Sequence, residues 1–177
     1  VFTANYNAKL FLQQVVQAGM MGADVLLGGV GGFGKLYPLQ NGLFWTDWFW
    51  CTQFTVIYKS AYESILQADF KETDVADEFL SKLFSNKMVI GPFISKQVDF
   101  GYSDVTRENN QKGKISSHFA LAEKRMSKFY SMLYGLDIRD NMGVYDEYMV
   151  SDYLRSASPK ALNIGCGTNI LPGWLNT

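Results

Sequence analysis

The chain has 177 residues, of which 47% are hydrophobic and 19% charged, and its formal net charge is −1. A disordered chain would be poorer in apolar residues, and a nucleic-acid-binding domain would carry a basic excess, so the composition disfavours both classes and predicts no nucleic-acid partner. A chain of this length buries a core without needing disulfides or metals, which predicts one domain, or one domain plus a fragment.

The cysteines and the longest uncharged run limit the class of protein further. Cys51 and Cys166 are isolated and far apart, without the spacing of metal ligands, so we expect free thiols in a reducing compartment and no metal site. Residues 10–23 form the longest uncharged run, which is shorter than the roughly 20 apolar residues of a membrane-spanning helix. No transmembrane helix is therefore expected. The chain begins at Val1 rather than at a methionine, and no targeting segment indicates its compartment.

The first half of the chain predicts a helix, a glycine-rich segment and a second, aromatic helix. Asn7 is a suitable cap for a helix that ends at Gly19. Residues 19–34 are apolar and rich in glycine, which suits a backbone that turns or approaches another group closely. Residues 43–70 are apolar on all sides at first and then carry a polar stripe. They predict one helix, buried or docked at its first end.

The second half predicts further helices. Acidic residues from Asp74 to Glu78 favour the start of a helix that runs to Asn86, and residues 88–100 predict an extended edge segment or a loop. Ser116 or Ser117 caps a helix that ends at Gly135, and a last helix covers residues 144–155.

The fold class that follows is mainly α, a compact helical domain with little sheet that ends in a partial α/β, Rossmann-like element. Four regions are expected: an aromatic- and glycine-rich helical region (1–103), a polar linker or loop (104–114), a helical pair (115–159) and a strand–turn fragment (160–177).

The last 18 residues, KALNIGCGTNILPGWLNT, contain a short apolar strand that runs into a glycine turn. This segment resembles motif I of the class I S-adenosylmethionine-dependent methyltransferases. The resemblance implies that Asn163, Gly165 and Gly167 line the cofactor, and that an acidic residue follows the next strand to bind the ribose. The sequence stops at Thr177 before such a residue, so we expect this chain alone not to be a competent enzyme.

A cluster of large aromatic residues allows two interpretations. Within a helix these side chains would fill a core, or they would form a docking patch for another chain, a pigment or lipid, since so many rings cannot all be buried on one helix face. The cluster consists of Phe44, Trp45, Trp48, Phe49, Trp50 and Phe54. His118 has no metal-ligand or catalytic partner in its neighbourhood and is interpreted as a solvated or capping residue.

Two functional hypotheses remain. The first is a non-catalytic accessory or linker subunit that docks its aromatic segment onto a larger, membrane-associated assembly, for which a photosynthetic antenna or photosystem in a plastid is one setting. The second is the N-terminal part of a class I methyltransferase that uses S-adenosylmethionine and continues beyond motif I. Neither assigns a catalytic residue within this chain.

Overall fold

The computed structural model describes residues 1–98, 111–155, 161–163 and 175–176. Its helices are α1 (Ala8–Met20), α2 (Lys59–Gln67), α3 (Ala76–Leu83), α4 (Lys114–Tyr134), the 3₁₀ helix η2 (Ile138–Asn141) and α5 (Glu147–Arg155). The main sheet contains β1 (Val25–Leu27), β3 (Leu36–Pro38), β4 (Leu43–Thr46), β6 (Thr55–Tyr58), β7 (Lys87–Ile90), β8 (Ala161–Asn163) and β9 (Leu175–Asn176). A second, two-stranded sheet pairs β2 (Gly32–Phe33) with β5 (Phe49–Trp50).

The expectation of a mainly helical domain is wrong, because a mixed sheet forms the centre of the molecule. Its strand order is β3-β4-β7-β1-β6-β8-β9. Strand β1 pairs parallel with β7 and antiparallel with β6, so the sheet combines both directions. Strand β7 lies between β4 and β1, and the expected edge position for residues 88–100 is therefore also wrong.

The aromatic segment explains why the sheet was missed. Residues 43–58 form β4, β5 and β6 rather than the start of a helix, and only the polar stripe of residues 59–67 is helical, in α2. The central strands are covered on both faces, so apolar and polar residues do not alternate along them. A short, continuous apolar run of this kind fits a buried helix as well as a strand.

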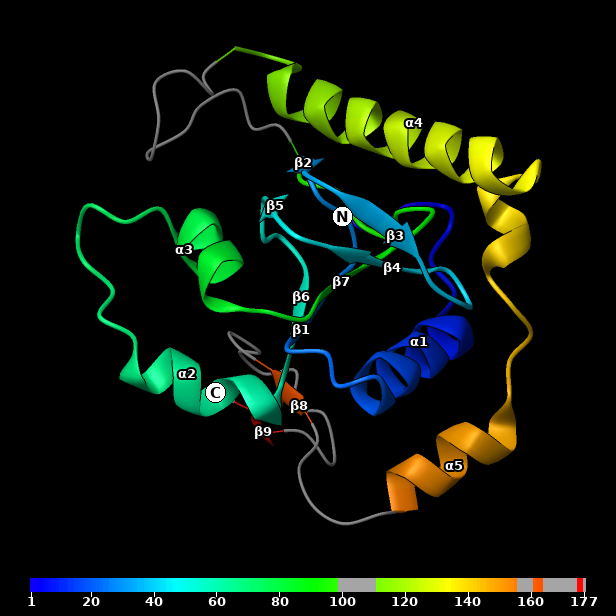
Figure 1. Ribbon diagram of the computed structural model, residues 1–177, viewed down its shortest axis with the longest axis horizontal. Helices are drawn as coiled ribbons and strands as arrows, with labels where there is room; N and C mark the ends of the chain where they lie inside the picture. Colours follow the sequence, from blue (N-terminus) through cyan, green and yellow to red (C-terminus); the bar gives the residue numbers. More distant parts are fainter. Residues whose placement is uncertain (99–110, 156–160, 164–174, 177) are drawn as a thin grey trace.

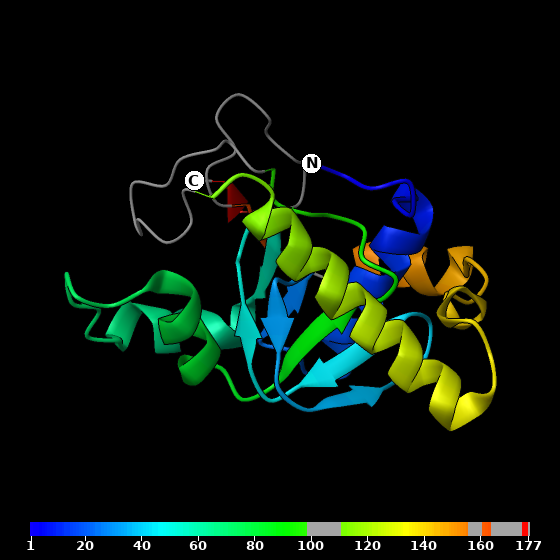
Figure 2. The same ribbon diagram turned by 90° about the horizontal axis from the view of Figure 1, so that it is seen from above.

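Two hydrophobic cores lie on the two faces of the main sheet. Successive residues of β4 belong to different cores, since Phe44 packs in the first and Leu43 in the second. The first core contains the buried stripe of α4, and the second contains the buried side of α1. Figures 1 and 2 show α4 across one face of the sheet and α1 on the other, with α5 beside α1.

Several helix boundaries predicted from the sequence are confirmed. The Asn7 side chain accepts hydrogen bonds from the N–H groups of Lys9 and Leu10 at the start of α1. Gly135 ends α4 with φ of 67°, a left-handed conformation that glycine adopts without strain. Helix α4 starts after Gly113 rather than at Ser116 or Ser117. Of the predicted linker, residues 104–110 lie outside the described residues.

Candidate functional site: a cationic groove beside helix α4

The predicted aromatic patch does not form one surface. Phe44 and Phe49 are fully buried in the first core, whereas Trp48 is 38% exposed in the turn between β4 and β5. Trp45 is partly buried and contacts the Tyr37 ring, and Trp50 contacts the His118 ring. Phe54 is partly buried between the rings of Phe2 and Phe11. The six residues are divided because short strands send alternate side chains to opposite faces. A docking role stays a prediction, for which Trp48 offers the most accessible ring of the six.

The centre of the glycine-rich segment, residues 25–31, is buried by the chain itself. A Cβ atom on Gly29 would lie 2.2 Å from the Ser95 carbonyl oxygen, and one on Gly31 would lie 2.7 Å from Cys51 Sγ. Other chain atoms therefore lie where side chains would stand. Internal packing accounts for the glycines at positions 28, 29 and 31.

The methyltransferase-like segment is described only in part. Asn163 ends β8, which pairs in parallel with β9 through Leu162 opposite Leu175 and Asn163 opposite Asn176. Gly165 and Gly167 lie outside the described residues. The cofactor role of all three residues stays a prediction from the resemblance.

A groove runs between α4 and the β2–β3 segment. We call it the α4 groove, and its volume is about 540 Å³. It is open to solvent, and its lining consists of Phe33, Gly34, Lys35, Leu36, Tyr37, Arg125, Lys128, Phe129 and Met132. Helix α4 supplies one wall because its core stripe packs on the sheet and leaves residues 125, 128, 129 and 132 on its flank. The β2–β3 segment supplies the other wall.

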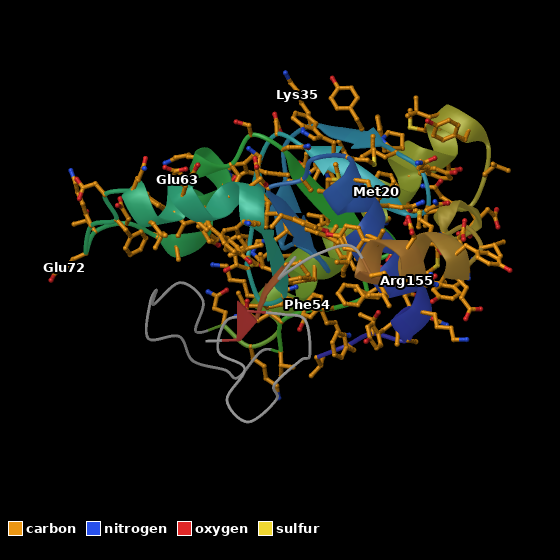
Figure 3. All side chains as sticks on the ribbon, turned by 90° about the horizontal axis from the view of Figure 1, so that it is seen from below. Met20, Lys35, Phe54, Glu63, Glu72 and Arg155 are labelled. Carbon is orange, nitrogen blue, oxygen red and sulfur yellow. The ribbon has the colours of Figure 1, made fainter. Side chains whose placement is uncertain are left out.

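All charged side chains that line the groove are cationic. Lys35, Arg125 and Lys128 are exposed, and within the described ranges no carboxylate lies within 4.0 Å of their charged groups. Figure 3 shows the Lys35 side chain extending outward at this edge of the molecule.

Contacts of neighbouring groups hold the two walls in place. Asp47 Oδ1 accepts a hydrogen bond of 2.6 Å from the Lys35 backbone N–H, which fixes the turn before β3. The Arg125 guanidinium lies 4.8 Å from the centroid of the Phe33 ring. Cations above an apolar, partly aromatic floor suit an anionic ligand that also carries an apolar group.

The buried titratable groups outside the groove have structural roles. The Lys87 ammonium group donates hydrogen bonds to the Ser81 and Phe84 carbonyl oxygens at the end of α3, and burial lowers its pKa. Burial raises the pKa of the Cys51 thiol to about 12, which keeps it protonated and a poor nucleophile. No cluster of metal-ligating side chains occurs among the residues that the structure describes.

Comparison of the chain with models of known protein families, with curated protein sequences and with solved structures finds no match. No helix within the described ranges is long and apolar enough to cross a lipid bilayer.

The sequence interpretation missed Lys35, Arg125 and Lys128. A signal for two of them was present, because the segment of α4 contains Lys114, Lys124, Arg125 and Lys128 but only one carboxylate, Glu123. Such an imbalance on one helix indicates a cationic face. Lys35 gives no comparable signal, since only the fold brings it opposite α4.

Proposed function

We propose that this protein is a non-catalytic docking module, an accessory subunit of a larger assembly, and that the α4 groove holds an acidic segment of its partner. The observation that carries the proposal is the set of three cations, Lys35, Arg125 and Lys128, without carboxylate partners around one apolar floor. Side chains of one sign placed together repel one another, so an anion at this position gains binding energy from all three.

The lining of the groove favours a peptide segment over a small metabolite. Small-molecule sites enclose most of their ligand, whereas this groove is open to solvent. Its floor offers the aromatic rings of Phe33 and Phe129, against which one apolar side chain of the partner would pack. Acidic residues on either side of that anchor would then face the cations, which supply specificity and speed of association.

Selection from a library of short displayed peptides tests this proposal. We expect the selected peptides to combine aspartate or glutamate with a large apolar residue, and their binding to weaken as salt is raised. The double variant Arg125→Glu/Lys128→Glu should lose this binding. Lys59→Glu is a matched control, because Lys59 is an exposed lysine at the start of α2, on another side of the molecule.

The possible results separate clearly. Selected peptides without acidic enrichment, or peptides that bind the double variant as well as the original chain, would contradict the proposal. If Lys59→Glu loses as much peptide binding as the double variant, binding depends on the net charge of the protein rather than on the groove.

A second candidate function is the methyltransferase reading of the C-terminal segment. The parallel pairing of β8 with β9 favours it, because neighbouring strands of a doubly wound sheet are parallel, whereas the antiparallel pairing of β8 with β6 does not match that sheet. Under this proposal Asn163, Gly165 and Gly167 would contact S-adenosylmethionine. Calorimetric titration with that cofactor tests it: micromolar binding that is lost in Gly165→Val would support the reading, and absence of heat would count against cofactor binding by this chain.

A further inference from the structure

The last turn of α4 exposes a group of large apolar side chains. We call this group the α4 tip, and its members are 50% to 75% exposed: Met132, Leu133, Tyr134 and Leu136. They lie within five consecutive residues around Gly135, where the helix ends. Large apolar side chains grouped in this way on a surface mark a contact site, whereas single exposed ones do not.

None of these residues belongs to the buried core, although the Tyr134 ring centroid lies 4.8 Å from that of the buried Tyr130. The buried stripe of α4 consists of Ile115, Phe119, Ala122, Met126 and Tyr130, and it ends one turn before the helix does. In Figure 2 the last turn of α4 lies at the periphery of the molecule, beyond the strands that the helix crosses. The tip therefore projects from the body of the protein.

The outward charges on the turns of α4 that precede the tip are cationic. Lys124, Arg125 and Lys128 are exposed on the preceding turns of α4. The only carboxylate of the helix, on Glu123, is half-buried and accepts a hydrogen bond of 3.0 Å from the Phe93 N–H. Beyond the tip, Asp137 forms an ion pair with Arg139, which offsets its charge, and the exposed Asp140 carboxylate accepts a hydrogen bond from the Asp137 N–H.

We infer that the α4 tip is a contact site for an anionic lipid surface. Exposed apolar side chains at a projecting end enter the boundary between headgroups and acyl chains, while neighbouring lysine and arginine side chains meet the headgroup charges. Tyr134 combines an apolar ring with a hydroxyl, a combination that is common at this depth of a bilayer. Charge complementarity selects an anionic membrane over a neutral one.

This inference goes beyond the proposed docking of a partner protein, since Leu133, Tyr134 and Leu136 belong to the tip alone, whereas Met132, Arg125 and Lys128 belong to both surfaces. The α4 groove holds its ligand beside residues 125–129, whereas the membrane contact depends on Leu133, Tyr134 and Leu136, which do not line the groove. Substitutions of Leu133 or Leu136 therefore leave the groove lining intact, so vesicle binding can be lost while peptide binding is kept.

Vesicle sedimentation with the 177-residue chain tests the inference. We expect binding to phosphatidylcholine vesicles that contain phosphatidylserine, little binding to phosphatidylcholine alone, and release by high salt. The double variant Leu133→Ser/Leu136→Ser should bind the anionic vesicles about tenfold more weakly, because both side chains would leave water on insertion. Lys124→Glu, which lies outside the groove lining, should weaken binding by about fivefold or more.

A matched control uses two other exposed leucines. Leu66 on α2 and Leu121 near the start of α4 are at least as exposed as Leu133, and Leu66→Ser/Leu121→Ser should bind vesicles as the original chain does. Circular dichroism would confirm that each variant is folded. Absence of binding to anionic vesicles, equal binding to neutral vesicles, or equal losses in the two leucine double variants would each overturn the inference. If the chain does not bind anionic vesicles, the exposed apolar side chains of the α4 tip would instead suit contact with a protein partner.

Discussion

The guanidinium group of Arg125 lies over the ring of Phe33, with 4.8 Å between Cζ and the ring centroid. This contact joins α4 to β2, two elements that are more than 80 residues apart in the chain. It holds a cation at the floor of the α4 groove without using its charge in an ion pair. The guanidinium group therefore stays available to an anionic ligand.

Replacing Arg125 with glutamine should have a small effect on stability and a large one on binding. Loss of the contact with Phe33 should lower the free energy of unfolding by about 0.5–1 kcal/mol, measured by urea denaturation. Binding of peptides selected on the groove should fall about tenfold, as measured by fluorescence anisotropy, since a charge-assisted contact is removed. Arg155→Gln removes the same charge from α5 and should change neither binding nor stability appreciably.

The glycine-rich segment offers a test of close packing. Gly29→Ala should destabilise the fold by about 1–3 kcal/mol, because the new Cβ would collide with the Ser95 carbonyl oxygen and the backbone would have to move. Gly32→Ala is its control, since a Cβ there meets the Trp48 ring at an ordinary contact distance of 3.4 Å. Thermal unfolding of the two variants should therefore differ clearly. Equal transition temperatures would show that the space beside Gly29 accommodates a Cβ atom.

Two neighbouring aromatic residues separate core packing from surface contact. Phe49→Ala should cost about 3–5 kcal/mol of unfolding free energy, because the ring is fully buried. Trp48→Ser should cost much less, since its ring is partly in water. If the aromatic segment docks on a partner, Trp48→Ser should weaken that association while the monomer stays folded. A severe loss of stability in Trp48→Ser would instead show that this ring belongs to the core.

The Cys51 thiol predicts a particular dependence of stability on pH. Its pKa is about 12 in the folded chain, with burial as the main cause and the Asp77 carboxylate as a second one, against an ordinary value of 9.0. Between these two values the unfolded chain has released the proton and the folded chain has kept it. The stabilisation is therefore complete below pH 9 and is lost as the pH rises toward 12.

Comparison with a Cys51→Ala variant isolates this effect. The free energy of unfolding of the original chain should fall more steeply above pH 9 than that of the variant, by an amount on the order of a few kcal/mol by pH 11. Tyrosine and lysine titrations contribute to both curves and cancel in their difference. Parallel curves would contradict the prediction.

Local patterns in the sequence determined most of the helices. Asn7 and Gly135 fix the start of α1 and the end of α4 through interactions with their immediate neighbours, so single residues were sufficient to predict them. The helix predicted over residues 43–70 is confirmed only in its polar second half, where α2 covers Lys59–Gln67. Helix caps and helical periodicity involve residues that are only a few positions apart in the chain. Both can therefore be recognised from the sequence alone.

Only the tertiary structure decided where the strands pair and where the cations meet. Strand β1 pairs with β7 about 60 residues later, and no local pattern distinguishes such a buried strand from a helix core. Strand β4 pairs with β7, which is also distant from it in sequence, and this pairing places Phe44 and Trp45 on opposite faces of the sheet. In the same way, Lys35 comes to lie opposite Arg125 because α4 packs on the sheet through its apolar stripe, a long-range contact driven by burial of apolar surface.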